Sequence, residues 1–148
     1  MFYEQIRAKQ ASQLLDWVQK TAQGRPCVIA VDMNAAPTRG QGHDYPPEAY
    51  STAIGHPLGL RSAYADVLGK EPAYTSWKIR SAQGKSVEVK YTVDYIFITN
   101  CIATDAVLAA PADGCVEPRR LPSFSYPSDH IALMAKLRFG GIKTEQAN

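Results

Sequence analysis

Val93-Asp94-Tyr95-Ile96-Phe97-Ile98 is a run of β-branched and aromatic residues, the types that favour strands, with a single carboxylate among them. A buried charge is costly unless it is paired or bound to a metal. A carboxylate beside apolar residues also occurs in Val28-Ile29-Ala30-Val31-Asp32-Met33-Asn34. It occurs again in Pro127-Ser128-Asp129-His130-Ile131, where an apolar run begins at Ile131. The three stretches predict strands that carry functional groups.

The polar residues of these stretches form a set suited to phosphoester hydrolysis. They are Asp32, Asn34, Asp94, Asp129 and His130. Acids and an amide at one sheet edge would bind a hard divalent cation, and the imidazole would remain for proton transfer. Each residue also has a structural explanation: a turn for Asp32, a salt bridge for Asp94 and half-burial for His130. Recurrence on three strands favours the chemical interpretation.

Composition indicates an ordinary globular domain. The chain has 148 residues, of which 45% are hydrophobic and 20% charged, and its net charge of +2 is too small to indicate nucleic-acid binding by itself. Its three cysteines match no zinc pattern, and no apolar run is long enough to cross a membrane. We expect no membrane partner and an intracellular location, the cytoplasm or, if residues precede Met1, the mitochondrion.

The first half of the chain has an α/β rhythm. Apolar residues spaced by three and four predict a helix over 3–21, ended by Gly24 and Pro26. Residues 27–31 predict a strand buried on both faces. A loop is expected over 35–47, followed by short helices over 48–54 and, with Ser62 as the N-cap, over 62–68.

The second half favours strands. β-prone residues predict strands over 73–79 and 87–98, joined by the hairpin turn 81–85. A weaker strand is expected over 103–108, a loop over 111–127 and a last strand over 131–139. Residues 140–148 read as a polar tail.

Three short motifs of this chain resemble motifs of a known protein superfamily and occur in the same order along the sequence. Val31-Asp32-Met33-Asn34-Ala35-Ala36-Pro37, Val93-Asp94-Tyr95-Ile96-Phe97 and Ser128-Asp129-His130 resemble those of the endonuclease/exonuclease/phosphatase superfamily. Residues 73–80 and 121–130 are similar to the nocturnin-like deadenylase branch. The resemblance implies that residues 1–139 are the C-terminal half of a four-layer α/β sandwich, with a mixed, mostly antiparallel sheet and flanking helices.

The resemblance also implies roles for the polar residues. Asp32 would engage the metal or orient the attacking water, and Asn34 would hold that water or the scissile phosphate. Asp94 would pair with His130, fix its tautomer and favour its charged form. His130 would stabilise the transition-state oxyanion or transfer a proton. Asp129 would take a supporting or second-metal role.

Basic residues provide candidates for substrate binding. Lys78 and Arg80 alternate along a strand and so share one face, and the matching residues of nocturnin-like proteins contact substrate phosphates. Trp77, on the opposite face, is expected in the core. Arg119 and Arg120 are expected either to approach substrate or to form a solvated basic pair.

The chain also departs from the family pattern. Val31 replaces a glycine and Met33 a phenylalanine, and the hairpin over 81–92 is longer than the family's. The principal metal-binding glutamate of the family lies in a first half that this sequence lacks. The expectation is that the chain alone binds Mg²⁺ poorly, has little activity and requires the missing N-terminal half as a partner.

Two classes of function follow. The first is a Mg²⁺- or Mn²⁺-dependent hydrolase acting on RNA 3′ ends, including poly(A), or on the 2′-phosphate of NADP(H); the sequence does not choose between them. The second is a non-catalytic binding or assembly module that retains the motifs by descent. A lipid-head-group phosphatase is disfavoured by the match of residues 77–80.

Overall fold

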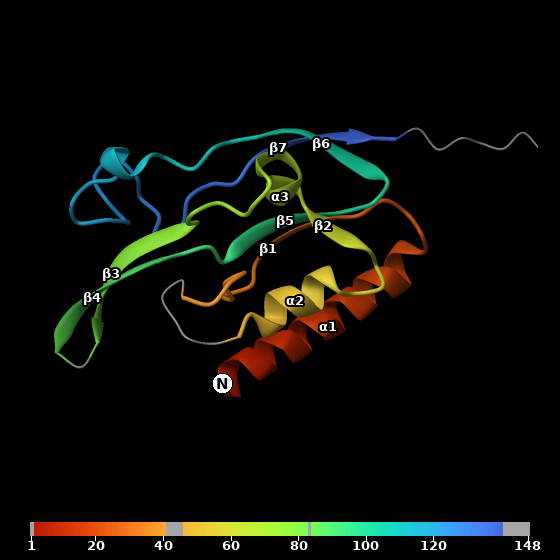
Figure 1. Ribbon diagram of the computed structural model, residues 1–148, viewed down its shortest axis with the longest axis horizontal. Coiled ribbons are helices and arrows are strands. Elements are labelled where there is room, and N and C mark those ends of the chain that lie inside the picture. The colour runs from red at the N-terminus through yellow and green to blue at the C-terminus, as the bar shows by residue number, and fades with distance from the viewer. Residues whose placement is uncertain (1, 41–45, 83, 141–148) are drawn as a thin grey trace, which may run out of the picture.

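The computed structural model describes residues 2–40, 46–82 and 84–140 (Figure 1). Its helices and strands are α1 (Phe2–Ala22), β1 (Val28–Asp32), α2 (Glu48–Ile54), β2 (Leu60–Ser62), α3 (Ala63–Leu68), β3 (Ser76–Ala82), β4 (Lys85–Tyr91), β5 (Asp94–Thr99), β6 (Ile102–Val107), the 3₁₀ helix η1 (Asp113–Cys115) and β7 (Ala135–Phe139). Strands in the described ranges form antiparallel sheets in the orders β1-β5-β2, β3-β4 and β6-β7. The predicted mixed α/β class with flanking helices is confirmed.

The main core lies between α1, α2 and one face of the β1-β5-β2 sheet (Figure 1). Alternate residues of β5, Tyr95 and Phe97, point to that face and are 2% and 1% exposed. They pack with Leu15 of α1 and Ala53 of α2. This packing holds β5 in the middle of the sheet, and β5 begins at Asp94.

The prediction that β1 is buried on both faces was wrong. Its residues alternate between exposed and half-buried, and Val28 is 43% exposed. Ile29 and Val31 pack against the main core, whereas the alternate residues Val28, Ala30 and Asp32 are exposed. β1 therefore behaves as a strand with one covered face, and Asp32 is exposed at its end.

The single strand predicted over 87–98 is two strands in different sheets. β4 pairs with β3, whereas β5 pairs with β1 and β2. Thr92 and Val93 form the junction between them. Asp94 is consequently the first residue of a strand and not an interior one.

The helices predicted from the sequence agree with the structure. Helices over Phe2–Ala22, Glu48–Ile54 and Ala63–Leu68 agree with the predictions. The Ser62 hydroxyl accepts the Ala65 amide at 3.3 Å, and Gly69, with φ of 72°, ends α3 in the left-handed conformation. None of the described helices is long and apolar enough to span a membrane.

Other strand boundaries required correction. β2 was missed, and the strand expected over 73–79 occupies Ser76–Ala82. The last strand begins at Ala135, because residues 131–134 pair with no strand within the part of the chain that is described. Some of the predicted stretches lie outside the described residues: 141–148 of the tail, 41–45 of the loop and Gln83 of the hairpin turn.

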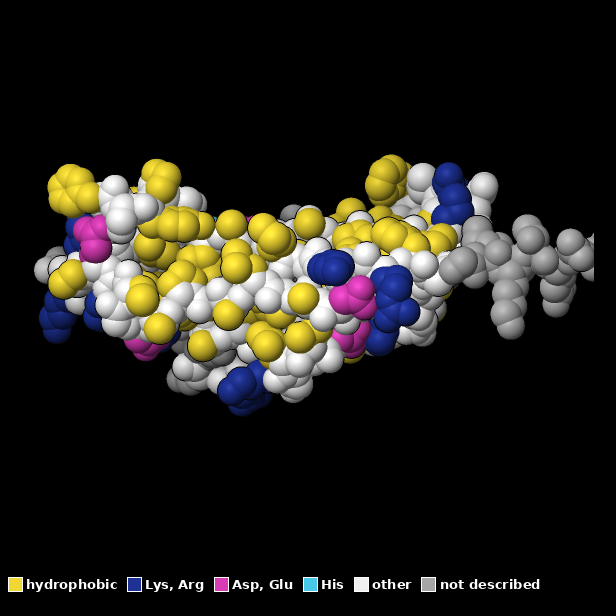
Figure 2. All heavy atoms as spheres, turned by 90° about the horizontal axis from the view of Figure 1, so that it is seen from above, with side chains coloured by type: hydrophobic (Ala, Val, Ile, Leu, Met, Phe, Trp, Pro, Cys, Tyr) yellow, Lys and Arg dark blue, Asp and Glu magenta, His cyan; other side chains and the backbone are white. Residues whose placement is uncertain are grey.

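Figure 2 shows hydrophobic side chains gathered on the upper face, where β6 and β7 lie in Figure 1.

Candidate active site

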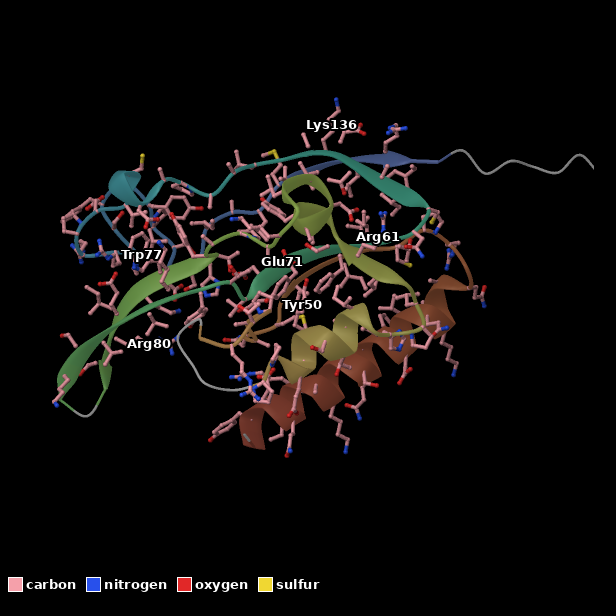
Figure 3. The ribbon with its side chains drawn as sticks, viewed as in Figure 1. Tyr50, Arg61, Glu71, Trp77, Arg80 and Lys136 are labelled. Carbon is pink, nitrogen blue, oxygen red and sulfur yellow. The ribbon has the colours of Figure 1, made fainter. Side chains whose placement is uncertain are left out.

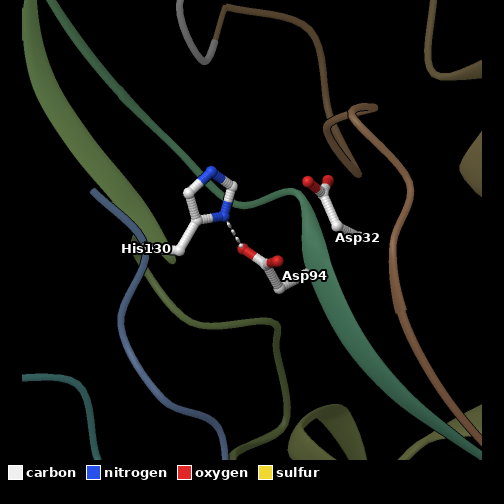
Figure 4. Close-up of side chains that lie close together, drawn as sticks. All are labelled: Asp32, Asp94 and His130. Atoms are coloured by element: carbon white, nitrogen blue, oxygen red, sulfur yellow. Dashed lines mark hydrogen bonds and ion pairs between the residues drawn. The ribbon is translucent and has the colours of Figure 1, made fainter. Parts of the chain in front are cut away.

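Three of the predicted residues converge at one end of the β1-β5-β2 sheet (Figure 4). Asp32 and Asp94 are direct partners in the β1-β5 register, so their side chains emerge on the same face. His130 reaches them from the segment before β7. One potential ligand atom from each of the three residues lies within 4.8 Å of the other two.

The predicted pairing of Asp94 with His130 is confirmed. His130 Nδ1 lies 2.9 Å from Asp94 Oδ2, and the two side chains are 26% and 18% exposed. A carboxylate only accepts hydrogen bonds, so Nδ1 must carry the proton. Nε2 is then left to meet a reacting group. The backbone amide of His130 donates to Ser128 Oγ at 3.1 Å, which tightens the turn that presents the imidazole.

Asn34 is bound to Asp32 by a compact turn. Its backbone amide donates to Asp32 Oδ1 at 2.8 Å and its side-chain Nδ2 to Oδ2 at 3.2 Å. The φ of Asn34 is 49°, a conformation that asparagine tolerates better than most residues. Both residues are exposed, so both face the open side of the site.

Asp129 lies beside this group and has another partner. Lys78 Nζ donates to Asp129 Oδ2, and Lys78 is 11% exposed. This hydrogen bond is the main reason that the pKa of Asp129 is lowered from its ordinary value. Asp129 Oδ2 also lies 3.9 Å from His130 Nε2. Lys78 thus has an acidic partner within the chain, and the metal-binding role predicted for Asp129 stays a prediction.

The remaining basic candidates divide between the hairpin and the loop. Arg80 is exposed on β3, where its Nη2 donates to Tyr91 Oη at 3.4 Å (Figure 3). Trp77 is 5% exposed, which confirms its place in the core. Arg120 lies 4.4 Å from the centre of the Trp77 ring and donates to Glu88 at 2.8 Å. Arg120 therefore fastens the loop to the hairpin.

Arg119, the other member of the basic pair, takes a different position. Its guanidinium carbon lies 5.1 Å from the centre of the ring of Phe124, a side chain that is 91% exposed. The two adjacent arginines thus have different neighbours, and the approach of either one to substrate stays a prediction.

Sequence reasoning missed Thr75 and Ser76, which connect the site's elements. Thr75 Oγ1 accepts the amides of Val93 and Asp94. Ser76 Oγ donates to the carbonyl oxygen of Asp129 at 2.8 Å. Both residues occur within the stretch that carries the family resemblance, but neither is charged. Only their buried contacts distinguish them.

The donor set fits a hard divalent cation. Asp32 and Asp94 bring carboxylate oxygens to the same place, and these are the ligands that Mg²⁺ and Mn²⁺ prefer. Asp94 Oδ2 is hydrogen-bonded to His130, which leaves Oδ1 for a metal. The two carboxylates, rather than the imidazole, are therefore the residues that would hold such an ion.

Comparison with known proteins identifies relatives of this chain. No protein-family model matches the chain. Nocturnin of Xenopus laevis is 37% identical over 143 residues, which cover 93% of this chain and 34% of that protein. The 2′,5′-phosphodiesterase 12 of Mus musculus is 30% identical over 134 residues, covering 78% of this chain and 20% of that protein.

A solved structure shares the fold. An endonuclease/exonuclease/phosphatase protein from Bacteroides vulgatus superposes with a TM-score of 0.56 at 18% identity, covering 92% of this chain and 45% of that one. The fold is that of an endonuclease/exonuclease/phosphatase protein. The chain is a nocturnin-like member of that superfamily and spans about a third of the length of the nocturnins it matches.

Proposed function

We propose that this chain contributes the acid–base part of the active site of a metal-dependent phosphoester hydrolase. The convergence of Asp32, Asp94 and His130 carries the proposal, because two carboxylates and an imidazole within 4.8 Å match the needs of that reaction. The relation to nocturnin and to a 2′,5′-phosphodiesterase supports the same class of chemistry.

The residues would act in complementary ways. Asp94 holds the His130 ring through Nδ1 and stabilises its positive charge, so that Nε2 exchanges a proton with a phosphoryl or attacking oxygen. Asp32 and Asn34, on the exposed turn after β1, orient the water or the scissile phosphate. Mg²⁺ or Mn²⁺ held by Asp32 and Asp94 would neutralise charge on the phosphoryl oxygens.

The substrates that we propose are RNA 3′ ends, including poly(A), or the 2′-phosphate of NADP(H). The exposure of Arg80 on β3 supports the proposal that its guanidinium binds a substrate phosphate. Because the chain spans about a third of the nocturnins it matches, we also propose that the complete site draws on the N-terminal half of the domain as a partner. Alone, the chain would then bind Mg²⁺ weakly and hydrolyse little.

The test uses a protein that includes the N-terminal half. It is incubated with NADPH and, separately, with a poly(A) oligomer in Mg²⁺, and released phosphate and shortened RNA are measured. The expected result is hydrolysis of one substrate that His130→Ala abolishes. Lys136→Ala, an exposed change on β7, is the control that keeps activity. Undiminished hydrolysis by His130→Ala would contradict the proposal.

A further inference from the structure

The chain changes sheets immediately before Asp94. β4 ends at Tyr91 in the β3-β4 sheet, and β5 begins at Asp94 in the β1-β5-β2 sheet. Val93 is 3% exposed, so its amide at this junction needs a protein acceptor.

Thr75 supplies that acceptor from a fully buried position. Its Oγ1 accepts the amide of Val93 at 2.9 Å and that of Asp94 at 3.1 Å. A hydroxyl has two acceptor lone pairs, so one oxygen serves both amides. The first residue of β5 is thereby fixed at its backbone, two bonds from the Asp94 side chain.

The backbone of the same residue holds the segment that carries His130. The Thr75 carbonyl accepts the amide of Ile131 at 2.8 Å. The next residue, Ser76, forms an isolated β-bridge with His130. The Thr75 amide also donates to the Tyr91 carbonyl at 3.0 Å, which ties the arrangement to the end of β4.

We propose that Thr75 is a positioning residue that sets the separation between Asp94 and His130. Its side chain fixes the strand that bears the acid, and its carbonyl fixes the turn that bears the imidazole. The catalytic importance of this separation rests on the proposed function, whereas the structural link does not. The 2.9 Å contact between Asp94 and His130 then depends on one uncharged side chain.

The proposed role of Thr75 depends on its side-chain oxygen, Oγ1, which accepts the two amide hydrogen bonds. Valine has nearly the same size and shape but accepts no hydrogen bond, so Thr75→Val leaves the amides of the buried Val93 and the half-buried Asp94 without their acceptor. The start of β5 is then free to shift, and hydrogen bonds weaken steeply with distance and angle. Thr75→Ser keeps the oxygen and loses only a methyl group.

The test is NMR of the His130 imidazole nitrogens in the 148-residue chain, in alkaline buffer so that the neutral ring is observed. His130→Ala assigns the signals. We expect the wild type and Thr75→Ser to show the proton on Nδ1. Thr75→Val should give a mixture of the two tautomers, as Asp94→Asn should. Thr52→Val, which removes a hydroxyl that donates to the Glu48 carbonyl on α2, is the matched control and should leave the wild-type pattern.

The outcomes separate a positioning role from a structural one. If Thr75→Val unfolds at a lower temperature but keeps the wild-type His130 pattern, Thr75 is only structural and the proposal is overturned. If Thr75→Val does not fold, Thr75→Cys decides, since its weak sulfur acceptor should give a partial loss of the Nδ1 tautomer. An unchanged pattern in Thr75→Cys also overturns the proposal. Because the readout needs no substrate, a failure of the proposed function would leave this result standing.

Discussion

Two partly buried carboxylates have different surroundings: Asp94 begins β5, and Glu71 lies in the loop between α3 and β3. Asp94 pairs with His130 at the end of the β1-β5-β2 sheet, next to the exposed Asp32. Glu71 accepts hydrogen bonds from Tyr50 at 2.8 Å and Ser62 at 2.9 Å, on the side of α2 (Figure 3). Burial is the main cause that raises the pKa of Glu71.

The difference shows how a site carboxylate is distinguished from a structural one. Both carboxylates are partly buried, so burial alone does not separate them. The hydrogen-bond partner does separate them. Asp94 contacts a titratable ring whose Nε2 lies 3.9 Å from Asp129 Oδ2, beyond hydrogen-bond distance, whereas Glu71 accepts hydrogen bonds from the neutral hydroxyls of Tyr50 and Ser62. A titratable partner near solvent allows proton transfer. Neutral buried partners fasten α2 to the strands.

The largest expected effect tests the Asp94–His130 pair. In the complete enzyme, His130→Ala should lower kcat by about 10²–10⁴-fold, because general acid–base catalysis contributes that much. Its unfolding temperature should change little, because His130 is 26% exposed. Glu71→Gln should leave kcat nearly unchanged. Steady-state kinetics and thermal unfolding of both variants make the comparison, and a large loss of kcat in Glu71→Gln would undo it.

The next effect is on stability. Glu71→Ala leaves the hydroxyls of Tyr50 and Ser62 without their acceptor and should reduce the free energy of unfolding by about 1–3 kcal/mol. Urea denaturation of the 148-residue chain measures it. Asp105→Ala, which breaks an exposed pair with Arg138, should cost less than about 1 kcal/mol. Equal losses in the two variants would show that the Glu71 network contributes no more than a surface pair.

The two carboxylates with shifted pKa values should give opposite pH dependence. The pKa of Glu71 is raised in the folded state, so the folded chain binds that proton more tightly, and stability falls as pH rises from 4.5 towards the raised pKa. The pKa of Asp129 is lowered, so its contribution is present above 3.8 and is lost as pH falls through the lowered pKa. The free energy of unfolding is measured as a function of pH. Glu71→Gln should remove the decrease that comes from Glu71 as pH rises, and Lys78→Met should remove the decrease that comes from Asp129 as pH falls. If the pH dependence persists in the corresponding variant, another group causes it.

The smallest expected effect concerns the exposed arginine of β3. Arg80→Met in the complete enzyme should raise KM for an anionic substrate about 2–10-fold, and the difference should shrink at high salt because exposed charges are screened. Lys136→Met is the charge-matched control, on β7 and away from Arg80 (Figure 3). If both variants raise KM equally, Arg80 acts only through the net charge of the protein.

Local signals accounted for the helices and for most of the site. Ser62 and Gly69 marked the ends of α3 because a capping hydroxyl and a left-handed glycine act within one turn. Asp32, Asp94 and His130 were recognisable because each places an ionisable group beside an apolar run, which is unfavourable without a partner. The sequence alone therefore determined the α/β class and the groups that meet at the sheet edge.

Tertiary structure alone decided how the strands divide and what holds the site. The residues from 87 to 98 are mostly β-prone on both sides of Thr92 and Val93, so the change of sheet there depends on distant partners and not on composition. The pairing of Lys78 with Asp129 and the double hydrogen bond to Thr75 join segments far apart in the chain. Such contacts exist only once the sheets have packed, because each needs two segments whose separation the fold itself fixes.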